Sequence, residues 1–133
     1  MGTLSPWSKS SVALASRQKS YYYEQQARRY LEQAGLRYIA ANVLCRGGEI
    51  DLIMQQQQTW VFVEVRYRRT NRYGGALISV TLRKQRCLYH AARVWLLRQG
   101  LCINIAPCRF DVIAFTGESP TIDWIPNAFT INW

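Results

Sequence analysis

Residues 48–69 read GEIDLIMQQQQTWVFVEVRYRR, two runs typical of buried β-strand that also carry three acidic side chains, Glu49, Asp51 and Glu64. Ionised groups are rarely buried without a partner, so these acids need a physical explanation. The polar run 55–58 between the two strands, 49–54 and 60–67, predicts that they form a hairpin. The stretch therefore predicts two paired strands with carboxylates in them.

Side chains alternate across a strand, which predicts the face that each residue occupies. In the first strand we expect one face to carry Ile50, Leu52 and Met54 and the other to carry Glu49 and Asp51. In the second strand we expect one face to carry Val61, Val63 and Val65 and the other to carry Phe62, Glu64 and Arg66. Asp51 and Glu64 then lie close together, where like charges repel unless a cation sits between them.

Two interpretations of this carboxylate pair follow from the residues alone. Mg²⁺ usually accepts one or two carboxylates and completes its shell with water and substrate phosphate, and such an ion can activate water for phosphodiester cleavage. Alternatively, Asp51 and Glu64 belong to a structural ion-pair network with Arg66, Arg46 or Arg68. The pattern leaves both interpretations open.

The whole chain predicts an α/β fold with the element order α-β-β-β-α-β-β. The expected helices and strands are 19–34, 36–45, 49–54, 60–67, 79–99, 109–115 and 121–125. Gly47-Gly48 is expected to form a turn or bulge, and Ser79 is placed to cap the second helix. The long helix between the third and fourth strands permits a parallel crossover, so we expect a mixed central sheet flanked by helices. Residues 1–17 are expected to be a flexible N-terminal arm and 18–133 a single domain.

Composition indicates the kind of partner. The 133 residues include 17 Lys and Arg against 8 Asp and Glu, a net charge of +9, which favours nucleic acid or an anionic membrane surface. No apolar run approaches the roughly 18 residues needed to span a bilayer, so we expect no membrane insertion and a cytoplasmic location. The cysteines, expected to be reduced core thiols without zinc-ligand spacing, are Cys45, Cys87, Cys102 and Cys108.

Each helix carries one charged residue near its apolar stripe. Glu24, at the edge of the first stripe, either approaches the acidic strands or is a solvated carboxylate. Lys84, within the second stripe, either reaches the acids or extends its ammonium to water.

Arginines follow the acidic strands and recur on the second helix. With Tyr67 and Tyr73 among them, they are typical of a surface that binds phosphates and stacks on bases, although solvated basic faces are the simpler alternative. The candidate nucleic-acid-binding residues are Arg46, Arg68, Arg69, Arg72, Arg83 and Arg86.

Four segments together resemble the bacterial YraN family. They are Arg28-Arg29-Tyr30-Leu31, Gly48-Glu49-Ile50-Asp51-Leu52-Ile53, Phe62-Val63-Glu64-Val65-Arg66 and Lys84-Gln85. The resemblance covers roughly Tyr23 to Phe115. That family is similar to archaeal Holliday-junction resolvases and is grouped with the PD-(D/E)-x-K nuclease superfamily. The resemblance implies a restriction-endonuclease-like sheet and metal-dependent phosphodiester hydrolysis.

The resemblance also implies roles for individual residues. Asp51 and Glu64 match the two motif acids that bind Mg²⁺ or Mn²⁺, with the carbonyl of Val65 as a further ligand. Glu24 matches a helical acid of the resolvase-like branch. Gln85 matches a polar residue on the following helix, and its spacing to Tyr89 loosely resembles the Q-x-x-x-Y of another nuclease branch.

The chain departs from the motif at two positions. Ile50 replaces the proline before the first acid, and Arg66 replaces the motif lysine. Arginine stays protonated near neutral pH, so Arg66 can orient water or bind phosphate but cannot act as a base. Lys84 is a candidate for supplying a displaced ammonium group.

Three functional hypotheses result. The first is a metal-dependent endonuclease acting on branched or flapped DNA, with a homodimer expected by analogy with resolvases. The second is a catalytically inactive nucleic-acid-binding module on the same fold. The third is a protein-interaction or membrane-surface role for the basic faces.

Overall fold

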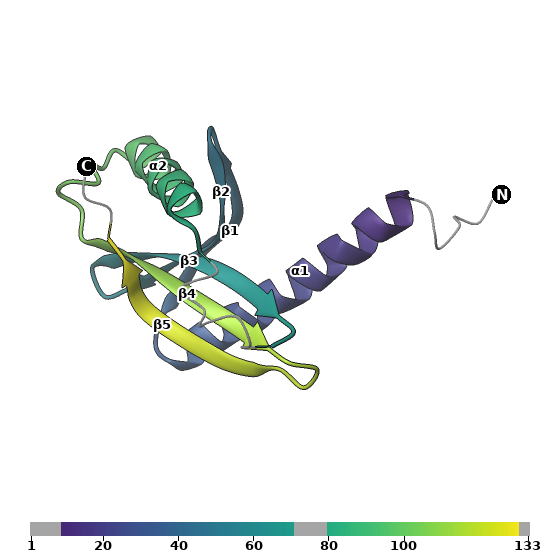
Figure 1. Ribbon diagram of the computed structural model, residues 1–133. Coiled ribbons are helices and arrows are strands. Elements are labelled where there is room, and N and C mark those ends of the chain that lie inside the picture. Colours follow the sequence, from purple (N-terminus) through teal and green to yellow (C-terminus); the bar gives the residue numbers. More distant parts are fainter. Residues whose placement is uncertain (1–8, 71–79, 131–133) are drawn as a thin grey trace.

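The computed structural model describes the backbone of residues 9–70 and 80–130, and the side chains of 17–70 and 80–130 (Figure 1). Its elements are α1 (Lys9–Gln33), β1 (Arg37–Cys45), β2 (Gly48–Gln56), β3 (Thr59–Arg68), α2 (Leu82–Arg98), β4 (Cys108–Thr116) and β5 (Thr121–Phe129). The predicted order α-β-β-β-α-β-β and the α/β class are confirmed.

The strands form one mixed sheet in the order β1-β2-β3-β4-β5. β3 and β4 are parallel because α2 returns the chain across the sheet, and the other neighbouring pairs are antiparallel. Helix α1 packs on one face and α2 on the other (Figure 1). The predicted sheet with helices on both faces is therefore present.

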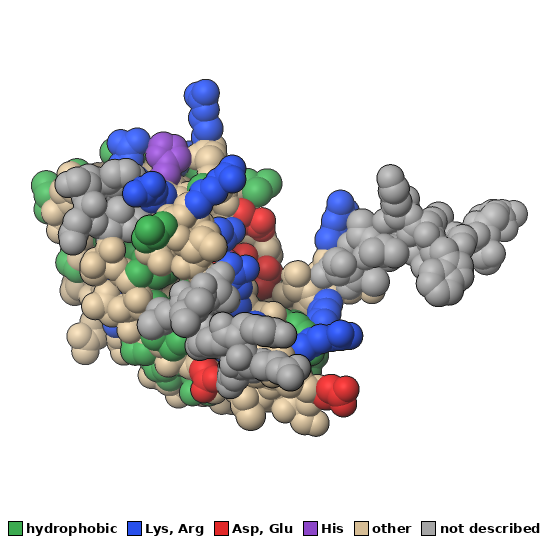
Figure 2. All heavy atoms as spheres, in the orientation of Figure 1, with side chains coloured by type: hydrophobic (Ala, Val, Ile, Leu, Met, Phe, Trp, Pro, Cys, Tyr) green, Lys and Arg blue, Asp and Glu red, His purple; other side chains and the backbone are tan. Residues whose placement is uncertain are grey.

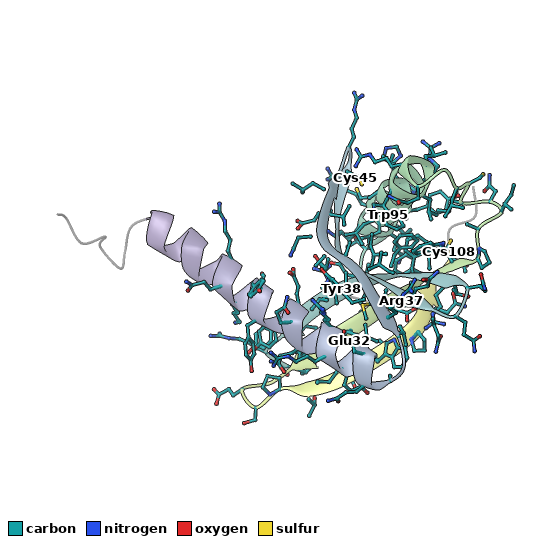
Figure 3. All side chains as sticks on the ribbon, turned by 180° about the vertical axis from the view of Figure 1, so that it is seen from behind. Glu32, Arg37, Tyr38, Cys45, Trp95 and Cys108 are labelled. Atoms are coloured by element: carbon teal, nitrogen blue, oxygen red, sulfur yellow. The ribbon has the colours of Figure 1, made fainter. Side chains whose placement is uncertain are left out.

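The two faces of the sheet carry two separate apolar cores. Under α1, Ala27 and Leu31 pack with strand residues including Leu52 and Val63. Under α2, the core includes Leu88, Ala91, Trp95, Ile53 and Phe62. Seen from behind, α1 crosses the near face beside Tyr38, whereas Trp95 belongs to the α2 side (Figure 3).

The helix boundaries correct two expectations. Helix α1 begins at Lys9, earlier than the expected Lys19, and its first turns extend beyond the sheet (Figure 1), so that part of the expected arm is helical. The N-cap of α2 is Thr81, whose hydroxyl accepts a hydrogen bond from the Lys84 amide at 3.2 Å. Ser79, the expected cap, lies outside the described residues.

The alternation expected in β2 is wrong at one position. Leu52 and Met54 share one face as predicted, and that face packs against α1, but Ile50 lies in the core under α2. The face therefore changes at Asp51, which is where pairing with β3 ends. In β3 the prediction is confirmed, because Val61 and Val63 face α1 and Phe62 faces α2.

The predicted turn at Gly47-Gly48 is confirmed, with Gly47 at a φ of 92° between β1 and β2. The four cysteines are free, as expected, but only Cys45 is buried. Cys102 is exposed because it follows the end of α2 in the loop before β4, so the expectation of a core thiol is wrong there. Neither described helix is both long enough and apolar enough to cross a membrane.

Candidate active site

The carboxylate pair lies where strands β2 and β3 separate. Their register runs from Gln56 opposite Thr59 to Leu52 opposite Val63, so Asp51 and Glu64 occupy the next position. There the Val65 amide donates a hydrogen bond to Asp51 Oδ2 at 2.9 Å. Glu64 remains in register with Val112 of β4. The predicted proximity of the two acids therefore occurs at an open end of the hairpin.

A cavity of about 400 Å³ opens over this end of the hairpin. It is lined from α1 by Lys19, Ser20, Tyr23 and Glu24, from β2 by Asp51, and from β3 by Glu64, Val65, Arg66 and Tyr67. Figure 2 shows acidic side chains in the hollow where the projecting helix meets the body, with Lys and Arg side chains beside them. The cavity thus brings together the acids from three elements.

Glu64 is buried but only partly compensated. Its Oε1 lies 3.7 Å from Arg66 Nε and 4.0 Å from Lys84 Nζ, which reaches the site from α2. Among the described residues, no donor forms a hydrogen bond with its buried Oε2. A buried carboxylate oxygen without a partner is costly, so this atom has the environment of a ligand site.

Burial raises the pKa of Glu64 to about 7, with the Asp51 charge adding to the effect and Lys84 and Arg66 opposing it. Burial also raises the pKa of Asp51, although the hydrogen bond from the Val65 amide partly offsets the rise. Burial and mutual repulsion thus oppose ionisation of both acids, and a cation bound between them would stabilise the ionised forms.

Glu24 joins this group from α1. Its side chain is 7% exposed, so the alternative of a solvated carboxylate is wrong. Burial raises its pKa to about 7, the Asp51 charge adds to this, and a hydrogen bond with Asn42 opposes it. Asn42 adopts a φ of 51° within β1.

The residues suit an ion such as Mg²⁺, which needs few protein ligands, better than an ion that needs a complete set of protein ligands. Within residues 17–70 and 80–130, no three His, Cys, Asp or Glu side chains converge closely enough to form a complete cluster. Asp51 and Glu64 do converge, and the unpartnered Glu64 Oε2 supplies a free oxygen. Two carboxylates with water and substrate phosphate are a usual Mg²⁺ shell, so the donor set is sufficient.

Other predicted site residues lie elsewhere. Gln85 donates from Nε2 to the Val80 carbonyl at 3.0 Å, and Tyr89 packs near Phe110, so both serve the start and packing of α2. Arg68 Nη2 lies 3.5 Å from Thr116 Oγ1. The exposed predicted arginines are Arg46, Arg69, Arg83 and Arg86. Arg72 and Tyr73 lie outside the described residues.

Sequence reasoning missed an aromatic wall of the cavity. Tyr23 stacks on Tyr67 with ring centroids 4.8 Å apart, and Lys19 Nζ lies 3.9 Å from the Tyr67 centroid. The signal was helical spacing, since Lys19 and Tyr23 are four residues apart and share a face with Glu24.

Asp111 is another buried carboxylate, and sequence reasoning did not single it out. It is fully buried and accepts hydrogen bonds from Arg109, from Trp124 Nε1 at 2.9 Å and from the Asn127 amide at 2.9 Å. Arg109 and Asp111 stand two apart on β4, the spacing that places side chains on one face. Because its oxygens are satisfied, Asp111 is structural.

Comparison with known proteins identifies the family. Residues 23–115 match the family described as "Uncharacterised protein family UPF0102". A UPF0102 protein of Serratia proteamaculans is 62% identical over 107 residues, covering 80% of this chain and 90% of the relative. One from Yersinia enterocolitica is 53% identical over 116 residues, covering 87% and 97%. The matched segment contains Glu24, Asp51 and Glu64, and the chain belongs to the UPF0102 family.

Proposed function

We propose that this protein is a metal-dependent endonuclease that hydrolyses phosphodiester bonds in branched or flapped DNA. The observation that carries the proposal is the buried, unpartnered Oε2 of Glu64 beside Asp51, at the solvent-open end of a hairpin. The resemblance of these motifs to resolvase-like nucleases supports the same assignment. We also propose a cytoplasmic location, from composition, and a homodimer, by analogy with resolvases.

In this proposal Asp51 and Glu64 would hold Mg²⁺ or Mn²⁺ with the Val65 carbonyl as a further ligand, and Glu24 would bind the ion through water. When bound, such an ion supplies an activated water and neutralises charge that develops on the phosphate. The Val65 amide fixes the orientation of Asp51 through its 2.9 Å hydrogen bond. Glu24, with its pKa near 7, is able to hold or release a proton at neutral pH.

Arg66 and Lys84 are proposed to act on the phosphate. Both lie within 4.0 Å of Glu64 Oε1, so their positive charges are already directed at the cavity. Arg66 keeps its proton and binds phosphate oxygens, a role for which its planar guanidinium is suited. Lys84 supplies the ammonium that the motif otherwise places at position 66. The exposed arginines bind flanking phosphates without reading sequence.

The decisive test is cleavage of end-labelled four-way-junction, flap and linear DNA in Mg²⁺, Mn²⁺ or EDTA. We expect metal-dependent cuts that disappear in EDTA and in the Asp51→Asn variant. Asparagine retains an oxygen that can accept from the Val65 amide, so the variant is expected to fold while it loses the ionised ligand.

The matched control is Asp123→Asn, which removes an exposed carboxylate from β5. It should cut like the wild type. Equal cutting by the Asp51→Asn protein, or activity that survives EDTA, would contradict the proposal.

A second candidate is an inactive nucleic-acid-binding module. It is favoured by the two cations near Glu64, which partly compensate its charge without a metal. Under this alternative the protein binds DNA with an affinity that does not respond to Mg²⁺ and gives no product with any substrate or metal. DNA binding with metal-independent affinity and no cleavage would therefore select the second candidate.

A further inference from the structure

A second cavity lies against the first, on the other side of the acids. It measures about 490 Å³ and is lined by Arg17, Ser20, Tyr21, Glu24, Asn42, Glu49 and Asp51. Ser20, Glu24 and Asp51 line both cavities. The two hollows are therefore neighbouring halves of one groove that passes under α1, with Glu24 and Asp51 at its centre.

Tyr21 and Tyr23 line this groove, and Tyr22, which lines neither cavity, contacts the Tyr23 ring. Tyr21 is 60% exposed and Tyr22 is 57% exposed, although neither is needed to cover the sheet. Tyr22 meets Tyr23 edge-on at 5.3 Å, and Tyr23 in turn stacks on Tyr67. Exposed rings beside a polar groove are a common platform for unpaired bases.

Two basic residues, Arg17 and Lys19, precede these rings along α1. Arg17 lines one half of the groove and Lys19 the other, so each half has a cation from the helix. Four acids, Glu24, Glu49, Asp51 and Glu64, face the same space, and their charge repels phosphate unless a metal neutralises it. A strand bound here is therefore expected to bind more tightly when Mg²⁺ is present.

The depth of the acids limits what can reach them. Glu24 is 7% exposed and Glu64 is 4% exposed, and the cavities over them measure about 490 and 400 Å³. Spaces of this size take a drug-sized ligand or single nucleotides. A single unpaired strand fits spaces of this size, whereas a duplex is a broad cylinder, so the recessed site is better suited to unpaired nucleotides.

We propose that the two cavities form one groove for a single unpaired nucleic-acid strand, with Tyr21 and Tyr22 stacking on its bases beside the acids. This deepens the proposed nuclease function, on which it rests for the position of the phosphate. It selects the unpaired arm of a flap, and not the paired arms of a junction, as the segment delivered to Asp51 and Glu64.

Binding tests the proposal without requiring cleavage. Fluorescence anisotropy with the Asp51→Asn protein compares a labelled oligo-dT with a blunt duplex of the same length, in Mg²⁺ and at fixed salt. We expect tighter binding of oligo-dT, and a loss of about tenfold or more when Tyr21 and Tyr22 are both replaced by alanine. Replacement of both by phenylalanine keeps the rings and should keep the affinity.

The matched control is Tyr30→Ala, which removes a tyrosine from the same helix. The Tyr30 ring centroid lies 6.3 Å from that of Trp124 in β5, and neither of these residues lines either cavity. It should bind oligo-dT like the parent protein. Thermal unfolding of every variant shows whether the fold is intact, and the phenylalanine pair provides the comparison if alanine disturbs the helix.

The outcomes separate this proposal from the nuclease assignment. Preference for oligo-dT that depends on the two rings supports the groove, even if the wild type cuts no substrate. Equal affinity for duplex and oligo-dT, or affinity unaffected by the alanine pair, overturns the groove while metal-dependent cutting would still stand. Tighter binding to vesicles of anionic lipid than to oligo-dT at equal salt also overturns it.

Discussion

Asp111 and Glu64 are both buried carboxylates on neighbouring strands, but their surroundings differ. Asp111 receives two donors from Arg109 and one each from Trp124 and Asn127. Glu64 has two cations at 3.7 and 4.0 Å and one oxygen that no described donor reaches. The structural carboxylate of Asp111 thus has a full set of hydrogen-bond donors. The incomplete set around Glu64 therefore supports the proposed role of this residue as a ligand.

The raised pKa values of Glu24 and Glu64 predict how stability depends on pH. Both rise from 4.5 to about 7, so the native state binds more protons than the unfolded chain between these values. The free energy of unfolding should therefore fall as pH rises through this window in EDTA, by roughly 1 kcal/mol per pH unit for each group. Urea unfolding between pH 5 and pH 7.5 measures this slope.

The Glu64→Gln variant should show a shallower slope, because it lacks one of the acids whose pKa is raised. Millimolar Mg²⁺ should raise the stability of the wild type most at the upper end of the range, where both acids are ionised. Stability that rises with pH in EDTA would show that the acids are better compensated than their surroundings indicate.

Residue patterns predicted the central pair of acids but not their whole environment. Strand alternation and a hairpin register were sufficient to bring Asp51 and Glu64 together. The change of face at Ile50 was not predictable, because it arises where β2 leaves β3 and alternation assumes a regular ladder. The contact between Lys19 and Tyr67 was not predicted, because it joins a helix to a strand.

At the scale of elements, the parts that bury an apolar face were predictable and the others were not. Strands β1 to β4 and the body of α2 lie close to their expected ranges, whereas β5 extends four residues past the expected end at residue 125. The start of α1 was placed ten residues late because its outer turns extend past the sheet and need no apolar stripe there (Figure 1). The cap of α2 was predicted at Ser79 and lies at Thr81, because both residue types cap helices and serine is the more favoured of the two.

The hairpin of β1 and β2 approaches α2 closely at Gly48, which has no side chain. A Cβ at Gly48 would lie 3.0 Å from the Cys87 carbonyl oxygen, which belongs to the helix backbone. Gly48→Ala should force the hairpin away from α2 and lower the free energy of unfolding by about 1–3 kcal/mol. Chemical denaturation of the purified variant measures the loss.

Gly35→Ala is the comparison. Apart from its chain neighbours, no described residue has an atom within 4 Å of a Cβ added at Gly35, so only the φ of 98° opposes the change. It should cost about 1 kcal/mol through the backbone alone. A Gly48→Ala protein as stable as the wild type would mean that the hairpin does not depend on this close approach.

At the scale of the whole molecule, the net charge of +9 predicts that the proposed DNA binding is strongly dependent on salt. Each phosphate contact adds close to one to the slope of log affinity against log salt. Replacing Arg83 and Arg86 together by glutamine should lower that slope by about 2, as measured by anisotropy from 50 to 200 mM NaCl.

Arg93→Gln is the control, since Arg93 is an exposed arginine of the same helix outside the predicted binding set. It should leave the slope unchanged. If the double replacement also leaves it unchanged, α2 does not contribute to the DNA-binding surface.

The hydrogen bond from the Val65 amide to Asp51 has a spectroscopic consequence. One backbone proton of the sheet is joined directly to an ionisable oxygen, at 2.9 Å between nitrogen and oxygen. The amide resonance of Val65 should therefore sense the charge on Asp51 through a single contact. Its position in a nitrogen-15 spectrum reports the protonation state of Asp51 and can be measured before any substrate is known.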